Sequence, residues 1–209
     1  MAQAKVIFLV EEESMEAFLQ IVFPRICGEA LECRIRKFQG KQDLLGKIPS
    51  LFQGYAKGLP ASDRVIVLLD RDDDDCAQLK MLVESAAQSA GLPTRQANPA
   101  GWQLAICIVI EELEAWYFGD WSAVCAAYPR VPKNIPAKSK YRNSDAIQGG
   151  TAEALERILQ RAGYYKAGLA KADAARRVAE HFDPSRCRSP SFRYFYKVLR
   201  EICSVPDDA

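Results

Sequence analysis

Three short apolar runs, each ending in acidic residues, constrain this chain more than any other feature. They cover residues 5–10, 64–69 and 104–110, and carboxylates follow each of them at once. A continuous apolar run of this length is typical of a strand buried on both faces, which occurs mainly in parallel sheets. Segments with helical spacing separate the runs, so the sequence predicts an α/β protein with a mainly parallel sheet flanked by helices.

The segments between the runs complete this alternating pattern. Residues 31–38 alternate apolar and charged side chains, which is typical of a half-buried strand near a sheet edge. Apolar residues recur at helical spacing in three further segments, where we expect helices: residues 15–22, 44–55 and 79–90. Ser14 is the expected N-cap of the first of them.

The C-terminal third, residues 128–209, has a different character from residues 1–127. It opens with a loop rich in proline and lysine, residues 128–148, and continues with three predicted helices at residues 152–162, 170–182 and 191–203. Each helix carries an apolar stripe, so we expect a helical extension that packs on the α/β core and forms one compact unit with it.

Composition excludes several classes of protein. The 209 residues carry a net charge of +1, so the chain lacks the overall excess of basic residues found in most DNA-binding domains. Lysines and arginines are instead concentrated from Arg130 to Arg200, away from the acidic clusters. No apolar run is long enough to span a membrane, and no phosphate-binding loop of the P-loop type is present.

The cysteines and the single histidine limit the chemistry further. The seven cysteines contain no CxxC pair, and the N-terminus lacks a secretory signal, which predicts reduced thiols in a cytoplasmic protein. With His181 as the one histidine, we expect neither a zinc site nor a Ser-His-Asp or Cys-His mechanism.

Asp70 and Asp72 follow the second apolar run as an Asp-x-Asp pair. In extended backbone these side chains point to the same side, where they repel each other unless a cation lies between them. Mg²⁺ and Mn²⁺ prefer such oxygen ligands, and ligands of open α/β sheets bind at the carboxyl ends of strands. Glu11, at the end of the first run, can therefore supply a further ligand or a general base. The alternative for Asp70 and Asp72 is a solvated acidic loop without a metal. Asp73, Asp74 and Asp75 are expected to be charges at the start of the next helix, where they favour the helix dipole.

The third acidic cluster offers one more carboxylate. If it opens a helix, Glu111 and Glu114 share a face. Glu114 is then a fourth carboxylate of the metal site or a ligand of a second ion, and the alternative is a charge stabilised by the helix dipole. Trp116, Tyr117 and Phe118, which follow, are expected in the core, and the alternative is a platform on which nucleic-acid bases stack.

The basic segment is the candidate surface for phosphates. The expected nucleic-acid-binding residues are Lys138, Lys140, Arg142, Lys166 and Arg188, and further candidates are Lys171, Arg186 and Arg193. The alternative for each is an ordinary solvated charge.

Leu9-Val10-Glu11, followed by Leu68-Leu69-Asp70-Arg71-Asp72, resembles the glutamate and Asp-x-Asp signatures of the Toprim fold. This fold occurs in topoisomerases, primases and overcoming-lysogenization-defect nucleases. Nearly the whole chain is similar to a bacterial family of domains of unknown function with a Toprim-like core, through residues 10–19, 112–116, 163–166 and 188–192. Members resemble partners of ATPases in phage-defence operons. One departure is Glu12, which stands where many Toprim domains have glycine.

The resemblance implies a Toprim-like core at residues 1–127 and two functional hypotheses. The first is a nuclease that uses Mg²⁺ or Mn²⁺ on Glu11, Asp70 and Asp72, with Glu114 as a further catalytic carboxylate, to cleave DNA or RNA in phage defence. The second is a non-catalytic regulatory or nucleic-acid-binding subunit of an ATPase complex, with the ATPase encoded alongside.

Overall fold

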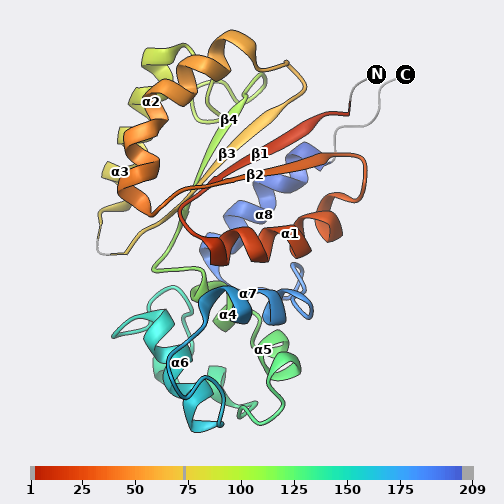
Figure 1. Ribbon diagram of the computed structural model, residues 1–209, viewed down its shortest axis with the longest axis vertical. Helices are drawn as coiled ribbons and strands as arrows, with labels where there is room; N and C mark the ends of the chain where they lie inside the picture. The colour runs from red at the N-terminus through yellow and green to blue at the C-terminus, as the bar shows by residue number, and fades with distance from the viewer. Residues whose placement is uncertain (1–2, 73, 204–209) are drawn as a thin grey trace.

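A parallel sheet forms the centre of the N-terminal part of the molecule (Figure 1). The computed structural model describes residues 3–72 and 74–203, and within them the strands are β1 (Lys5–Val10), β2 (Glu32–Lys37), β3 (Arg64–Asp70) and β4 (Leu104–Val109). Their order is β2-β1-β3-β4, and every pairing is parallel. The predicted parallel α/β sheet is confirmed, and β2 lies at its edge as its alternating pattern indicated.

Helices cover both faces of this sheet (Figure 1). On one face lie α2 (Lys41–Gly58) and α3 (Cys76–Ala90), and on the other lie α1 (Glu13–Cys27) and α8 (Pro190–Cys203). Successive strand residues point to opposite faces. Leu9 and Val67 accordingly pack in the core cluster with α2 and α3, whereas Phe8 and Ile66 pack in the cluster with α1 and α8. This double burial explains why the strands read as continuous apolar runs.

The remaining helices lie together beyond the carboxyl ends of the strands (Figure 1). They are α4 (Glu114–Gly119), α5 (Trp121–Ala127), α6 (Thr151–Arg161) and α7 (Lys171–Ala179), with short 3-10 turns at Ile135–Ala137 and Ser139–Tyr141. The predicted helical C-terminal third is confirmed. The division of the chain at residue 127 stays a prediction.

Aromatic side chains connect these helices to α1. Phe18 of α1 lies with its ring centroid 5.6 Å from Trp116 of α4 and 5.0 Å from Phe182, and Trp116 stacks on Phe195 of α8 at 5.2 Å. Trp116 and its neighbours therefore belong to the core, as expected. Among the described residues, no helix combines the length and apolar composition that crossing a membrane requires.

Several local boundaries differ from the expectations. The first helix does not end near Val22 but continues through Pro24 to Cys27, since its last turns carry Phe23 into the core. Ser14 lies inside this helix and donates its hydroxyl hydrogen to Glu12, which takes the N-cap position. The third helix begins as the acidic run indicated, because the Asp75 side chain caps it by accepting from an amide N–H three residues on.

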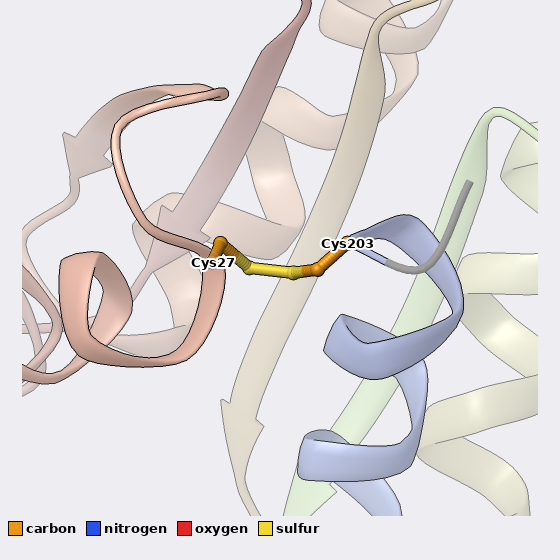
Figure 2. The surroundings of a disulfide bond; sticks show 2 residues. All are labelled: Cys27 and Cys203. Atoms are coloured by element: carbon orange, nitrogen blue, oxygen red, sulfur yellow. A yellow bond between two sulfur atoms is a disulfide. The ribbon is translucent and has the colours of Figure 1, made fainter. Parts of the chain in front are cut away.

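A disulfide joins the C-terminal ends of α1 and α8 (Figure 2). It links Cys27 to Cys203 across a sequence separation of 176 residues. The expectation that all seven cysteines are reduced thiols is therefore wrong for this pair. Spacing in the sequence gave no sign of it, because the two cysteines meet only after both helices pack on the same face of the sheet. The other five cysteines are free.

Candidate metal centre at the carboxyl edge of the sheet

Glu11 lies directly after β1 and points along the end of the neighbouring strand. Its Oε1 accepts a hydrogen bond from the backbone N–H of Asp70 at 2.8 Å, so the parallel register of β1 and β3 holds the side chain in place. Burial raises the pKa of Glu11 to about 7, and this effect outweighs the hydrogen bond and the nearby ammonium of Lys41. Glu11 is thus a carboxyl group that can gain or lose a proton near neutral pH.

Asp70, the last residue of β3, is the meeting point of the acidic side chains. Its pKa lies well above the ordinary value, first because of burial and then because of repulsion from Glu11, Glu12, Glu114 and Asp72. Repulsion of this kind requires carboxylates close to one another. Glu11 and Glu114, which come from two other acidic clusters, therefore lie near enough for their charges to act on Asp70.

Glu114 opens α4 and is completely buried. Its exposed fraction is 0%, and neither carboxylate oxygen has a hydrogen-bond partner among the described residues. Burial raises the pKa of Glu114 to about 7, although the ammonium of Lys171 acts in the opposite direction. Buried polar groups are nearly always paired, so an acid with two unpaired oxygens calls for a ligand.

Tyr117 lies one helical turn after Glu114. Its hydroxyl is also buried without a partner in the part of the chain that the structure describes. Its pKa is well above the ordinary value, first through burial and then through the charge of Glu114. The interior beside the carboxylates therefore holds two neighbouring groups with unmet hydrogen-bonding capacity.

Asp72 faces a lysine. Its backbone has φ +48°, a left-handed conformation that interrupts the extended strand, and its carboxylate forms an ion pair with Lys41 at 2.7 Å. The same ammonium contacts Asp74 at 2.6 Å and the carbonyl oxygen of Arg71 at 3.1 Å. The turn thus gives Asp72 a partner of its own, and its side chain is about half exposed (51%). Asp73 lies outside the described residues.

A second lysine reaches the site from the helical third. Lys171 of α7 contacts Glu112 at 2.7 Å and Glu12 at 3.9 Å. Burial alone would lower its pKa, but the carboxylates of Glu114, Glu112 and Glu12 outweigh burial and raise the pKa above the ordinary value. Lys171 therefore stays charged and balances part of the negative charge.

The shared helix face expected for Glu111 and Glu114 is not present. Glu111 lies before the helix with φ +62° and forms an ion pair with Arg71. Glu111 is turned toward the strand loop, while Glu114 is turned into the interior.

The donor set suits a hard divalent cation. Glu11, Asp70 and Glu114 offer carboxylate oxygens, which Mg²⁺ and Mn²⁺ prefer, and two of these oxygens are buried and unpaired. Within residues 3–72 and 74–203, however, no group of three His, Cys, Asp or Glu side chains is arranged to hold a metal ion. Binding an ion would thus require a side chain, such as that of Asp72, to turn toward the cluster.

Sequence reasoning missed three members of this site. Lys41 carried no signal, because a lysine at a helix start beside a glycine is ordinary. Lys171 was considered for phosphate binding, but in the structure it balances the carboxylates. Tyr117 was assigned to the core alone, and its spacing of three residues from Glu114 was the signal that could have placed it beside the carboxylate.

The expected phosphate-binding residues are divided in the structure. Arg142 and Arg188 line one pocket of about 1150 Å³ at the end of α4. Lys138, Lys140 and Lys166 are exposed and do not line it. The residues predicted as one basic surface therefore include a pair that shares a cavity.

The comparison with protein families identifies the family of this chain. The model for Domain of unknown function (DUF4276) matches residues 10–200, and the chain belongs to this family. The matched stretch includes the whole carboxylate cluster and the residues of the pocket. No curated protein and no solved structure matches the chain.

Proposed function

We propose that this DUF4276 protein is a metal-dependent nuclease that cleaves phosphodiesters of DNA or RNA at the carboxylate cluster. The observation that carries the proposal is Glu114, fully buried with both oxygens unpaired and close enough to Asp70 to raise its pKa. An unpaired buried acid costs free energy, and a divalent cation shared with Asp70 and Glu11 would remove that cost.

The residues that would hold Mg²⁺ or Mn²⁺ are Glu11, Asp70 and Glu114, with Asp72 as a further ligand. When bound, the cation supplies positive charge that stabilises the charge developing on a phosphodiester oxygen. Glu11 has the pKa of a general base, since a group with a pKa of about 7 accepts a proton from water efficiently at neutral pH. Lys171 and Lys41 hold the surrounding carboxylates in place.

The resemblance to Toprim nucleases of phage-defence operons supports the same residues. The Toprim signatures fall on Glu11, Asp70 and Asp72, and all three lie at the carboxyl edge of a parallel sheet. The resemblance also supports a cytoplasmic protein that acts on nucleic acid together with an ATPase encoded alongside.

A second function is favoured by the pairing of Asp72 with Lys41. A cluster whose outer aspartate is already neutralised by a lysine can remain stable without metal. In that case the protein would be a non-catalytic subunit of an ATPase complex, and it would bind nucleic acid without cleaving it.

A cleavage assay separates the two functions. Plasmid DNA, single-stranded DNA and tRNA would be incubated with Mg²⁺ or Mn²⁺ and the wild type, Asp70→Asn or Asp74→Asn. Asp74→Asn is the matched control, because it removes a carboxylate of the same acidic run that contacts Lys41. We expect metal-dependent cleavage by the wild type and the control, and none by Asp70→Asn.

The outcomes are distinct. Cleavage by Asp70→Asn at the wild-type rate would refute a role for the cluster. If the wild type cleaves none of the substrates, even with the neighbouring ATPase present, but still binds one of them, the non-catalytic function is the correct one.

A further inference from the structure

A second polar cavity lies at the other end of α4. The pocket of about 1150 Å³ is formed by the end of α4, the start of α5, the loop that carries Arg142 and the segment before α8. Glu11, Asp70 and Glu114 do not line it, so it is separate from the carboxylate cluster. Its volume is slightly above the range of about 300–1,000 Å³ that is typical of pockets for small organic ligands, and it far exceeds the space needed for a single inorganic anion.

Positive charge dominates this pocket. Five basic residues line it, against one acidic residue, Asp120. The basic residues are Lys133, Arg142, Arg186, Arg188 and Arg193. Asp120 is only 2% exposed, and both of its oxygens are held by the guanidinium of Arg186 at 3.0 and 3.2 Å. The single acid is thus already neutralised inside the wall.

The other cations are available to a ligand. Within the described residues, the side chains of Lys133, Arg142 and Arg188 form no ion pair with a carboxylate. The guanidinium of Arg193 is oriented by a hydrogen bond from its Nε to the carbonyl oxygen of Cys187 at 3.2 Å. Arginines with uncompensated charge around a cavity are the usual means of holding phosphate.

Aromatic rings form the apolar part of the wall. Phe118 stacks on Trp121 at 5.1 Å and on Tyr141 at 5.5 Å, with interplanar angles of 20° and 13°. All three residues line the pocket, together with polar side chains such as Asn143 and Ser185. The three rings are almost fully buried, at 3, 5 and 7% exposed, and they stack on one another, so they offer a ligand an apolar surface beside these polar groups. Such a mixed wall suits a flat heterocycle with hydrogen-bonding edges.

Close packing fixes the position of Arg188. Its backbone N–H donates to the carbonyl oxygen of Gly119 at 3.0 Å. A side chain at Gly119 would place its Cβ 2.6 Å from the Sγ of Cys187 and 2.9 Å from the backbone nitrogen of Ser189. Only glycine therefore allows this segment to lie against the end of α4, which brings Arg188 to the pocket.

We infer that this pocket binds a nucleoside phosphate, with the arginines on the phosphate and the aromatic wall beside the base. The same chemistry is offered by a free mononucleotide and by the phosphorylated end of a nucleic-acid strand. Binding here requires neither the metal nor cleavage at the carboxylate cluster, so the proposal goes beyond the nuclease function and does not depend on it.

Isothermal titration calorimetry in EDTA tests the inference. The probes are the four nucleoside 5′-monophosphates, adenosine, inorganic phosphate, and one short single strand made with a 5′-phosphate and with a 5′-hydroxyl. The variant is Arg142→Gln with Arg188→Gln. The matched control is Arg157→Gln with Arg161→Gln, which removes the same charge from two exposed arginines of α6 that do not line the pocket.

We expect the wild type to bind a monophosphate or the 5′-phosphorylated strand more tightly than adenosine or the 5′-hydroxyl strand. Each charge-assisted arginine contact corresponds to about a tenfold change in affinity, so the double variant should lose about 100-fold and the control less than about threefold. Preference for the monophosphate identifies a free nucleotide, and preference for the phosphorylated strand identifies a strand end.

Three results would overturn the inference. They are the absence of binding of every probe to the wild type, equal affinity in the wild type and the double variant, and inorganic phosphate competing as strongly as the nucleotides. Should the double variant unfold, Arg142→Gln alone gives the same test, because this side chain is exposed on a loop.

Discussion

Glu114→Gln should flatten the dependence of stability on pH. In the folded protein the pKa of Glu114 is about 7, against an ordinary value of 4.5. Between these values the unfolded chain has released the proton while the folded protein keeps it, so the free energy of unfolding falls as pH rises. Below this pH window Glu114 does not make stability depend on pH. Above about pH 7 its full effect is reached, and the free energy of unfolding has fallen by about 3 kcal/mol.

The assay is urea unfolding in EDTA at about pH 5 and about pH 8, where Glu114 should account for about 2–3 kcal/mol of the stability lost by the wild type. Glutamine has nearly the same shape but no charge. Between these two pH values the free energy of unfolding of Glu114→Gln should therefore fall less than that of the wild type, by the contribution of Glu114. Glu180→Gln, at an exposed position beside α7, is the control and should follow the wild type.

Adding Mg²⁺ to the same unfolding experiment gives a second, independent test. If Glu114 is a ligand, Mg²⁺ should stabilise the wild type more at about pH 8 than at about pH 5, because the cation competes with protons for the carboxylates. This gain should be smaller in Glu114→Gln. Parallel pH curves for wild type and variant would refute the reasoning about the buried acid, and equal gains with Mg²⁺ would refute its role as a ligand.

Three further predictions follow from single contacts. Glu11→Gln should lower the cleavage rate about 10²–10⁴-fold and should also reduce the Mg²⁺-induced shift of Tm, because Glu11 is one of the proposed ligands, and an unchanged rate would exclude a general base there. Gly119→Ala should lower the free energy of unfolding by about 1–3 kcal/mol in urea titrations, because its Cβ would lie 2.6 Å from the Sγ of Cys187, and full stability would contradict this packing. Alkylation of the denatured, unreduced protein should label five of the seven cysteines, because Cys27 and Cys203 are paired, and labelling of all seven would contradict the disulfide.

The sheet could be predicted because the burial of its strands is visible in the sequence as runs of apolar residues. A strand covered on both faces needs apolar side chains at successive positions, and β1, β3 and β4 have them. The ends of parallel strands meet at one edge, which is why Glu11 and Asp70 could be assigned to one site from their positions alone.

The remainder of the site depends on packing between distant segments. Lys171 reaches the carboxylates because α7 packs against α1. No sequence pattern near Lys171 predicts that contact. The left-handed turn at Asp72 changes the direction of a side chain that extended geometry would have aimed toward Asp70. The disulfide between Cys27 and Cys203 likewise results from helix packing and not from spacing.

The two sites are connected by one short helix, and this connection gives a final prediction. Glu114 is the first residue of α4 and Gly119, which lines the basic pocket, is the last, so their backbones lie about 8 Å apart at 1.5 Å per residue. In a duplex, successive phosphates of one strand advance about 3.4 Å along the axis, so a strand end bound in the pocket would place a bond a few nucleotides inward at the carboxylates.

A 5′-phosphorylated strand should therefore be cut at a constant, short distance from its end. Arg142→Gln with Arg188→Gln should scatter the cut positions but leave the dependence on Mg²⁺ unchanged, because the carboxylates are intact. Gel analysis of end-labelled products measures both effects. If cleavage occurs but its position ignores the 5′-phosphate and both arginines, the pocket does not guide the strand, and its ligand is a free nucleotide that binds independently of the substrate.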